Sequence, residues 1–180
     1  MNKRTGAKNS MNILAICGSI NKSSSNLNIL NAIRKFLKQE TQWNYFKIEE
    51  LPFFDPQLQF DKALPESVQT LRSLAQTSDF IVISTPEYAH GIPGVLKNAL
   101  EWLICEETMK KKVAIIIGSP SGGEFVKDYL TETIRTMDLL PADNRTLIIT
   151  SARSDIASDG EILNEELEIK IKKFVHDLWE

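Results

Sequence analysis

The sequence predicts an α/β fold in which helices cover both faces of an open, doubly wound parallel sheet of five strands. Apolar runs of strand length alternate with amphipathic stretches along almost the whole chain, and this alternation is typical of parallel strands joined by right-handed crossovers. Three loops rich in Ser, Gly or Pro each follow such a run, as binding loops do in sheets of this kind. The number and lengths of the strands fit the order 2-1-3-4-5.

The first strand and helix are the most clearly marked elements. Met11 to Cys17 is almost continuously apolar, as a strand covered on both faces should be. From Leu27 the apolar residues fall at helical spacing, so a helix follows the strand. Residues 43–48 are rich in aromatic residues but less uniformly apolar, which favours a strand at or near the sheet edge.

Residues 51–65 contain three prolines and three phenylalanines and fit neither a helix nor a strand. Long loops in compact folds are usually functional or covered by a partner. Phe53, Phe54 and Phe60 therefore indicate an interface or the wall of a site. The alternative is that they pack into the protein's own core.

The second half of the chain continues the alternation. Helices are predicted over residues 66–77, 95–103, 126–137 and 163–178, and strands over residues 79–85, 111–117 and 146–150. Pro93 suits the first turn of the second of these helices. The chain contains no internal repeat.

Length and composition limit the possible functions. The chain has 180 residues, 42% hydrophobic residues and a formal net charge of −3, which fits one globular domain over residues 11–180 and gives no sign of a nucleic-acid partner. No apolar run is long enough to span a membrane and no signal peptide is apparent, so we expect a cytoplasmic protein. Residues 1–10 are polar and basic, typical of a disordered N-terminal tail. Cys17 and Cys105 are expected to be buried free thiols and not metal ligands.

The loop from Gly18 to Asn26 has the character of a phosphate-binding loop. It lies between the first strand and the first helix and is rich in Ser and Asn. The unpaired N–H groups and the dipole of a helix N-terminus favour an anion there. The loop is neither a dinucleotide fingerprint nor a P-loop, because Gly18 is its only glycine. A loop that merely caps the helix is the alternative reading.

Two further loops, residues 86–94 and 118–123, should meet the first at one rim of the sheet. Together the three loops predict a binding site for a flat ring with a phosphate tail, and FMN is the leading candidate ligand. In this interpretation Gly118, Ser119 and Gly122 belong to a loop that offers backbone N–H and C=O groups to the pyrimidine end of the ring. His90 and His176 are the only histidines, and no hydrolase motif is present, so we assign no catalytic acid or base.

The residues that carry these loops resemble the NADPH-dependent FMN reductase family, which includes azo-, quinone- and chromate-reducing members. The resemblance rests on Gly18-Ser19 with Ser24 and Asn26, on Leu51-Pro52, on Thr85 to Tyr88, and on Ile92 to Trp102. It covers nearly the whole chain after Met11, and it implies a flavodoxin-like fold, bound FMN, and NADPH or NADH as the reductant.

By analogy with the family, two groups of residues are expected to bind the cofactor. Ser19, Ser24, Ser25 and Asn26 would hold the phosphate, and Pro86, Glu87, Tyr88 and Ala89 would flank the ring. The chain departs from the family pattern at Asn21, where an Arg is usual, and at Ala89-His90, where an Asn often follows the Tyr. Asn21 remains a candidate phosphate ligand, while the loss of the Arg affects the expected handling of NADPH.

The sequence thus predicts an oxidoreductase that passes a hydride from NAD(P)H through FMN to a small-molecule electron acceptor. A quinone, an azo compound, a free flavin or a metal ion are the acceptors considered. A non-enzymatic FMN electron carrier or flavin-binding sensor is the alternative. The resemblance also implies a homodimer or homotetramer, and no metal, nucleic-acid or membrane partner is expected.

Overall fold

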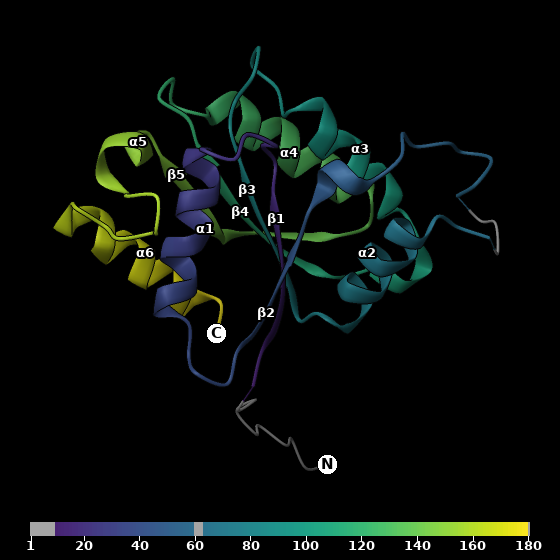
Figure 1. The fold of residues 1–180 in the computed structure, drawn as a ribbon, viewed down its shortest axis with the longest axis horizontal. Helices are drawn as coiled ribbons and strands as arrows, with labels where there is room; N and C mark the ends of the chain where they lie inside the picture. The colour runs from purple at the N-terminus through teal and green to yellow at the C-terminus, as the bar shows by residue number, and fades with distance from the viewer. Residues whose placement is uncertain (1–9, 60–62, 180) are drawn as a thin grey trace.

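A computed structural model describes residues 10–59 and 63–179, with the side chains of residues 142–144 outside the description. Five parallel strands form one sheet in the order β2-β1-β3-β4-β5 (Figure 1). They are β1 (Asn12–Cys17), β2 (Gln42–Phe46), β3 (Phe80–Thr85), β4 (Lys112–Gly118) and β5 (Leu140–Ile149). The predicted fold class and strand order are confirmed, and β2 lies at an edge of the sheet.

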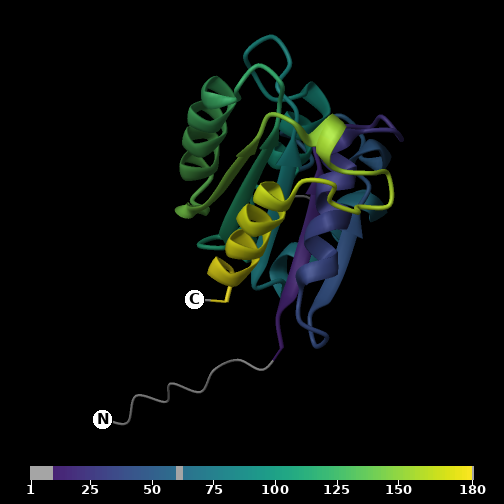
Figure 2. The same ribbon diagram turned by 90° about the vertical axis from the view of Figure 1, so that its left-hand side faces the viewer.

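Helices cover both faces of this sheet (Figures 1 and 2). One face carries α1 (Ser25–Phe36), α5 (Ala152–Asp155) and α6 (Glu165–Asp177), and the other carries α2 (Glu66–Thr77), α3 (Gly94–Trp102) and α4 (Glu124–Thr136). Two short 3₁₀ turns, η1 (Ile48–Glu50) and η2 (Glu106–Thr108), complete the elements. In the described part of the chain, no helix is long and apolar enough to cross a membrane.

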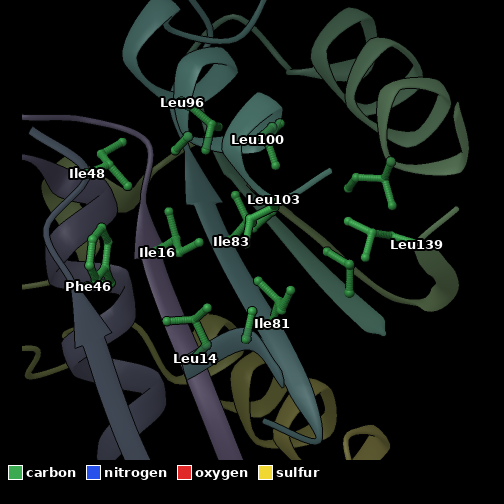
Figure 3. Packing of buried hydrophobic residues seen from close by; sticks show 14 of the residues in the cluster. Leu14, Ile16, Phe46, Ile48, Ile81, Ile83, Leu96, Leu100, Leu103 and Leu139 are labelled. Atoms are coloured by element: carbon green, nitrogen blue, oxygen red, sulfur yellow. The ribbon is translucent and has the colours of Figure 1, made fainter. Parts of the chain in front are cut away.

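Each face of the sheet packs its own hydrophobic core, because side chains alternate along every strand. Leu14 and Ile16 of β1 lie beside Ile81 and Ile83 of β3 (Figure 3) and share one hydrophobic cluster with residues of α2 and α3. Ile13 and its same-side neighbours contact α1 and α6 on the opposite face. The strands are therefore buried on both sides, as their continuous apolar character predicts.

The structure differs from the sequence prediction at several element ends. Strand β5 begins at Leu140, not at residue 146. Its pairing with β4 shifts register between Val113 and Ile115 of β4. Strand β2 ends at Phe46, and Ile48, the last residue of the predicted strand, begins η1. Pro93 is the N-cap of α3 and therefore precedes its first turn. The four-residue helix α5 was not predicted, because a segment this short shows no helical periodicity.

The loop that follows β2 is fixed to α3 by side-chain hydrogen bonds. The Phe54 N–H donates to Asn98 Oδ1 at 2.7 Å, and Trp102 Nε1 donates to the Pro52 carbonyl at 2.9 Å. Trp102 is fully buried with Phe54 against its ring, so its side chain belongs to the core of this chain. Phe53 is 93% exposed, as an interface residue should be. Phe60 and residues 1–9 of the predicted tail lie outside the described residues.

Both cysteines are free thiols, as predicted. Cys17 is buried at the end of β1, whereas Cys105 is only partly buried. Burial raises the pKa of the Cys17 thiol above its ordinary value, although hydrogen bonds from Ser19 and Ser24 oppose this effect. Cys17 is therefore a small apolar core residue at neutral pH.

Candidate functional site

Three loops meet at the carboxyl ends of three neighbouring strands, at one end of the sheet (Figure 1). They follow β1, β3 and β4, and we call them the first loop (residues 18–24), the second loop (residues 86–93) and the third loop (residues 119–123). Strands β1 and β3 flank the point where the strand order reverses. This is where ligands bind in open α/β sheets.

The first loop is organised by hydrogen bonds from its own polar residues. Ser24 is the N-cap of α1, and its Oγ accepts from the Asn26 N–H at 3.2 Å. Asn21 Oδ1 accepts from the Ser23 N–H at 2.9 Å, and the Asn21 N–H donates to Ser19 Oγ at 3.3 Å. Asn21 and Ser24 thus shape the loop with side-chain oxygens that backbone N–H groups already occupy.

The first loop also presents several unused donors. No described residue accepts a hydrogen bond from the backbone N–H groups of Ile20, Lys22 or Ser25. These groups lie at or just before the N-terminus of a helix of 12 residues, and Asn21 to Ser23 are exposed. There is no carboxylate in the loop. This donor set fits a phosphate group.

Asn26 connects α1 to the strands beneath the loops. Its side chain is buried, and Oδ1 accepts from Ser84 Oγ at 3.0 Å and from the Gly118 N–H at 3.2 Å. Its Nδ2 donates to the Gly118 carbonyl at 3.2 Å. A Cβ atom at Gly118 would lie 2.7 Å from Asn26 Oδ1, so this contact requires glycine. Asn26 and Gly118 therefore support the site from beneath, and the contact between Asn26 and a phosphate stays a prediction.

Glu87 connects the second loop to the third. Its side chain is only 3% exposed. Oε2 accepts hydrogen bonds from Ser119 Oγ at 3.0 Å and from Ser121 Oγ at 3.1 Å, and Oε1 lies 3.1 Å from His90 Nδ1. Burial raises the pKa of the Glu87 carboxyl, but the hydrogen bonds from His90, Ser119 and Ser121 outweigh burial and leave the pKa below its ordinary value. Glu87 is therefore an ionised carboxylate at neutral pH.

The second loop ends in a tight reversal from Tyr88 to Gly91. The two residues exchange backbone hydrogen bonds of 2.9 Å in both directions. Ala89 and His90 between them have φ angles of 50° and 60°, which is the pattern of a type I′ turn. The turn leaves Tyr88 57% exposed, and the His90 ring contacts Phe125 of α4 edge-on at 4.7 Å between centroids.

The predicted site residues come together at this rim, but they divide into two groups. Ser19, Asn21, Ser25, Tyr88, Ala89 and Gly122 lie at least partly open to solvent, whereas Ser24, Asn26, Pro86, Gly118, Ser119 and the Glu87 side chain lie beneath the surface. Sequence reasoning missed the linking roles of Ser84 and Ser121. A signal existed for Ser84, because it is a polar residue near the end of an otherwise apolar strand.

The sequence and the fold are similar to those of known proteins. The sequence model of the family described as NADPH-dependent FMN reductase matches residues 11–154. The NADH-dependent flavin reductase subunit 2 of Lactobacillus johnsonii is 29% identical over 168 residues, covering 87% of this chain and 89% of that protein. The NADH:(hydroxy)cinnamate reductase subunit CrdA of Vibrio ruber is 33% identical over 114 residues, covering 62% of this chain. That match spans only about half, 55%, of the Vibrio protein.

Among solved structures, the fold is similar to that of FerB, a flavoenzyme NAD(P)H:(acceptor) oxidoreductase from Paracoccus denitrificans. The TM-score is 0.84, and the similarity covers 94% of this chain and 95% of FerB at 24% sequence identity. At this level of identity the similarity establishes the fold alone.

Proposed function

The chain belongs to the NADPH-dependent FMN reductase family, and from this premise we propose that it is an oxidoreductase that carries electrons from NAD(P)H through bound FMN to a small-molecule acceptor. When bound, FMN takes a hydride from the nicotinamide and passes the electrons on. One observation carries the proposal. The first loop, with its free N–H groups, lies with the second and third loops at the carboxyl ends of β1, β3 and β4. The protein contributes binding, orientation and exclusion of water.

At the phosphate end, the residues present fit FMN. The free N–H groups of Ile20, Lys22 and Ser25 point to a ligand with several acceptor oxygens, and the helix N-terminus favours negative charge. We assign the direct contacts to these groups and to the Ser25 hydroxyl. Ser19, Asn21 and Ser24 hold the loop in shape.

At the ring end, the second and third loops supply an aromatic edge and exposed backbone. Tyr88 and Ala89 are exposed at the tip of the second loop, and Pro86 anchors its start in a buried position. Gly122 in the third loop has a φ of 107°, a conformation that favours glycine. The backbone at this position is therefore not covered by a side chain of its own. We propose that the ring lies between these loops, at a spacing that the Glu87 carboxylate sets.

We also propose that the chain functions as a homodimer or homotetramer. A groove of about 290 Å³ between α3 and α4 is lined by Leu100, Ile104, Tyr129 and Met137 together with charged residues and threonines. A second groove of about 660 Å³ lies on the other side of α3, beside Ile20 and Phe53. The second groove reaches the first loop at Ile20, and the apolar side chains along both grooves are of the kind that protein partners cover. Sedimentation of the flavin-bound protein at the 20.4 kDa monomer mass would contradict this assignment.

The proposed function is tested by reconstitution and turnover. Protein mixed with FMN and desalted should retain the flavin, and NADPH or NADH should be oxidised in the presence of a quinone, an azo dye, free flavin or a ferric complex. Flavin retained without nicotinamide oxidation would favour the alternative, an FMN carrier or sensor. A colourless protein after desalting would reject both. The cytoplasmic location expected from the sequence stays a prediction.

A further inference from the structure

A carboxylate and an imidazole form a pair at the rim of the site. Glu87 Oε1 and His90 Nδ1 lie 3.1 Å apart, while Glu87 Oε2 is occupied by the hydroxyls of Ser119 and Ser121. The carboxylate is buried, but the His90 side chain is 73% exposed. The pair therefore links a fixed, buried anion to a ring that is open to the site and to solvent.

The pair fixes where His90 carries its proton. An ionised carboxylate is only an acceptor of hydrogen bonds, so His90 Nδ1 must be the donor. In the neutral ring this leaves Nε2 as the basic nitrogen, and in the cationic ring Nε2 carries the exchangeable proton. No described residue forms a hydrogen bond with Nε2. The Phe125 ring, edge-on at 4.7 Å, limits the orientations of the imidazole.

No other charged group of the described residues contacts the His90 ring. On its own loop the ring meets Glu87, and on α4 it meets the uncharged Phe125. The nearest charges along α4, Glu124 and Lys127, pair with each other at 3.4 Å. Glu87 is thus the charged group that fixes the direction of the ring.

We propose that His90 donates a proton from Nε2 to the electron acceptor, with Glu87 as the residue that positions its ring. This inference rests on the proposed function. A carbonyl acceptor of the quinone class that gains a hydride at one oxygen becomes a monoanion with negative charge on the other oxygen. The Nε2–H bond of the imidazolium breaks and a new O–H bond forms at that oxygen, which gives the neutral hydroquinone. His90 is left neutral with its proton on Nδ1, and water returns the proton to Nε2.

The inference separates two kinds of acceptor. A quinone needs protons to complete its reduction, whereas ferricyanide takes single electrons and needs none. We therefore expect loss of the imidazole to slow quinone reduction and to spare ferricyanide reduction. General acids contribute about 10²–10⁴-fold to rates, and because water can replace an exposed acid in part, we expect a fall of at least about tenfold.

The first variant is His90→Asn, because Asn tolerates the φ of 60° at this position and so preserves the turn. His90→Gln is the second variant, and His176→Gln is the matched control, since His176 is the only other histidine and lies on α6, far along the chain. Quinone and ferricyanide reduction are measured at saturating NADPH with each protein. The inference predicts a lower quinone-to-ferricyanide rate ratio in both His90 variants and an unchanged ratio in His176→Gln.

A second readout needs no flavin. The ¹⁵N chemical shifts of the imidazole in the flavin-free protein report the tautomer directly, and the His176→Gln variant leaves a single imidazole to assign. We expect neutral His90 to carry its proton on Nδ1. A proton on Nε2, or an unchanged rate ratio in both His90 variants, would overturn the inference. Absence of flavin binding or of ferricyanide reduction in the unmodified protein would instead overturn the proposed function.

Discussion

Replacing Asn26 by Ala tests whether this residue is a support beneath the loops or a ligand on their surface. The change removes three hydrogen bonds that join α1 to β3 and β4, of 3.0, 3.2 and 3.2 Å. It leaves the buried Gly118 N–H and C=O groups without their amide partner. An unsatisfied buried group costs about 1–3 kcal/mol, so we expect the free energy of unfolding to fall by about 2–6 kcal/mol.

The assay is urea unfolding of the flavin-free protein, with Asn28→Ala as the matched control. Asn28 lies on the same helix, is partly exposed and has no side-chain hydrogen bond to a described residue. In a separate thermal unfolding experiment, the melting temperature of Asn26→Ala should fall by at least about 4 °C for a chain of this length. A free energy of unfolding equal to that of Asn28→Ala would refute the supporting role.

Three other predictions follow from the loops. Ser25→Ala combined with Lys22→Ala should weaken FMN binding by about tenfold or more but leave riboflavin binding nearly unchanged, because only FMN carries the phosphate; equal losses for both ligands, measured by fluorescence titration, would move the phosphate elsewhere. Ala89→Gly should stabilise the flavin-free protein by up to about 1 kcal/mol in urea unfolding, because Ala89 has a φ of 50° that glycine adopts without strain, and a destabilised variant would contradict this. Glu87 has a lowered pKa in the folded state, so its contribution to stability is present above the ordinary carboxyl pKa and is lost as the pH falls through the lowered value; Ser121→Ala should reduce this contribution in acid unfolding curves, and coincident curves would argue against it.

The fold was predictable because each element carries its own signal. The runs from Met11 to Cys17 and from residue 113 to 117 are almost continuously apolar, and a sheet covered on both sides explains this pattern. Strand ends and short elements were less predictable. The extension of β5 back to Leu140 depends on pairing with β4 across a register irregularity, and local sequence does not encode such pairing.

The loops of the candidate site were predictable from the sequence, but the hydrogen bonds that connect them were not. Both Asn26 and Glu87 were expected to contact the cofactor, which stays a prediction, and the sequence did not show that each also bonds to groups more than 30 residues away in sequence. Long-range hydrogen bonds of this kind have no periodic signature, because their partners are set by how the strands are paired. The polar residues at the ends of β3 and β4, Ser84 and Ser119, were the available sign that buried polar side chains would need partners there.

Anaerobic stopped-flow mixing of the FMN-loaded protein with NADPH and with NADH tests the central claim most directly. If the three loops form a working flavin site open to a nicotinamide, the visible absorbance of the flavin should bleach in a single turnover, and addition of a quinone should restore it. The variant Asn26→Ala, reconstituted with FMN, should bleach less completely because fewer molecules hold the flavin. Flavin that stays bound and oxidised in the presence of both nicotinamides would contradict the account and leave the protein as an FMN carrier or sensor.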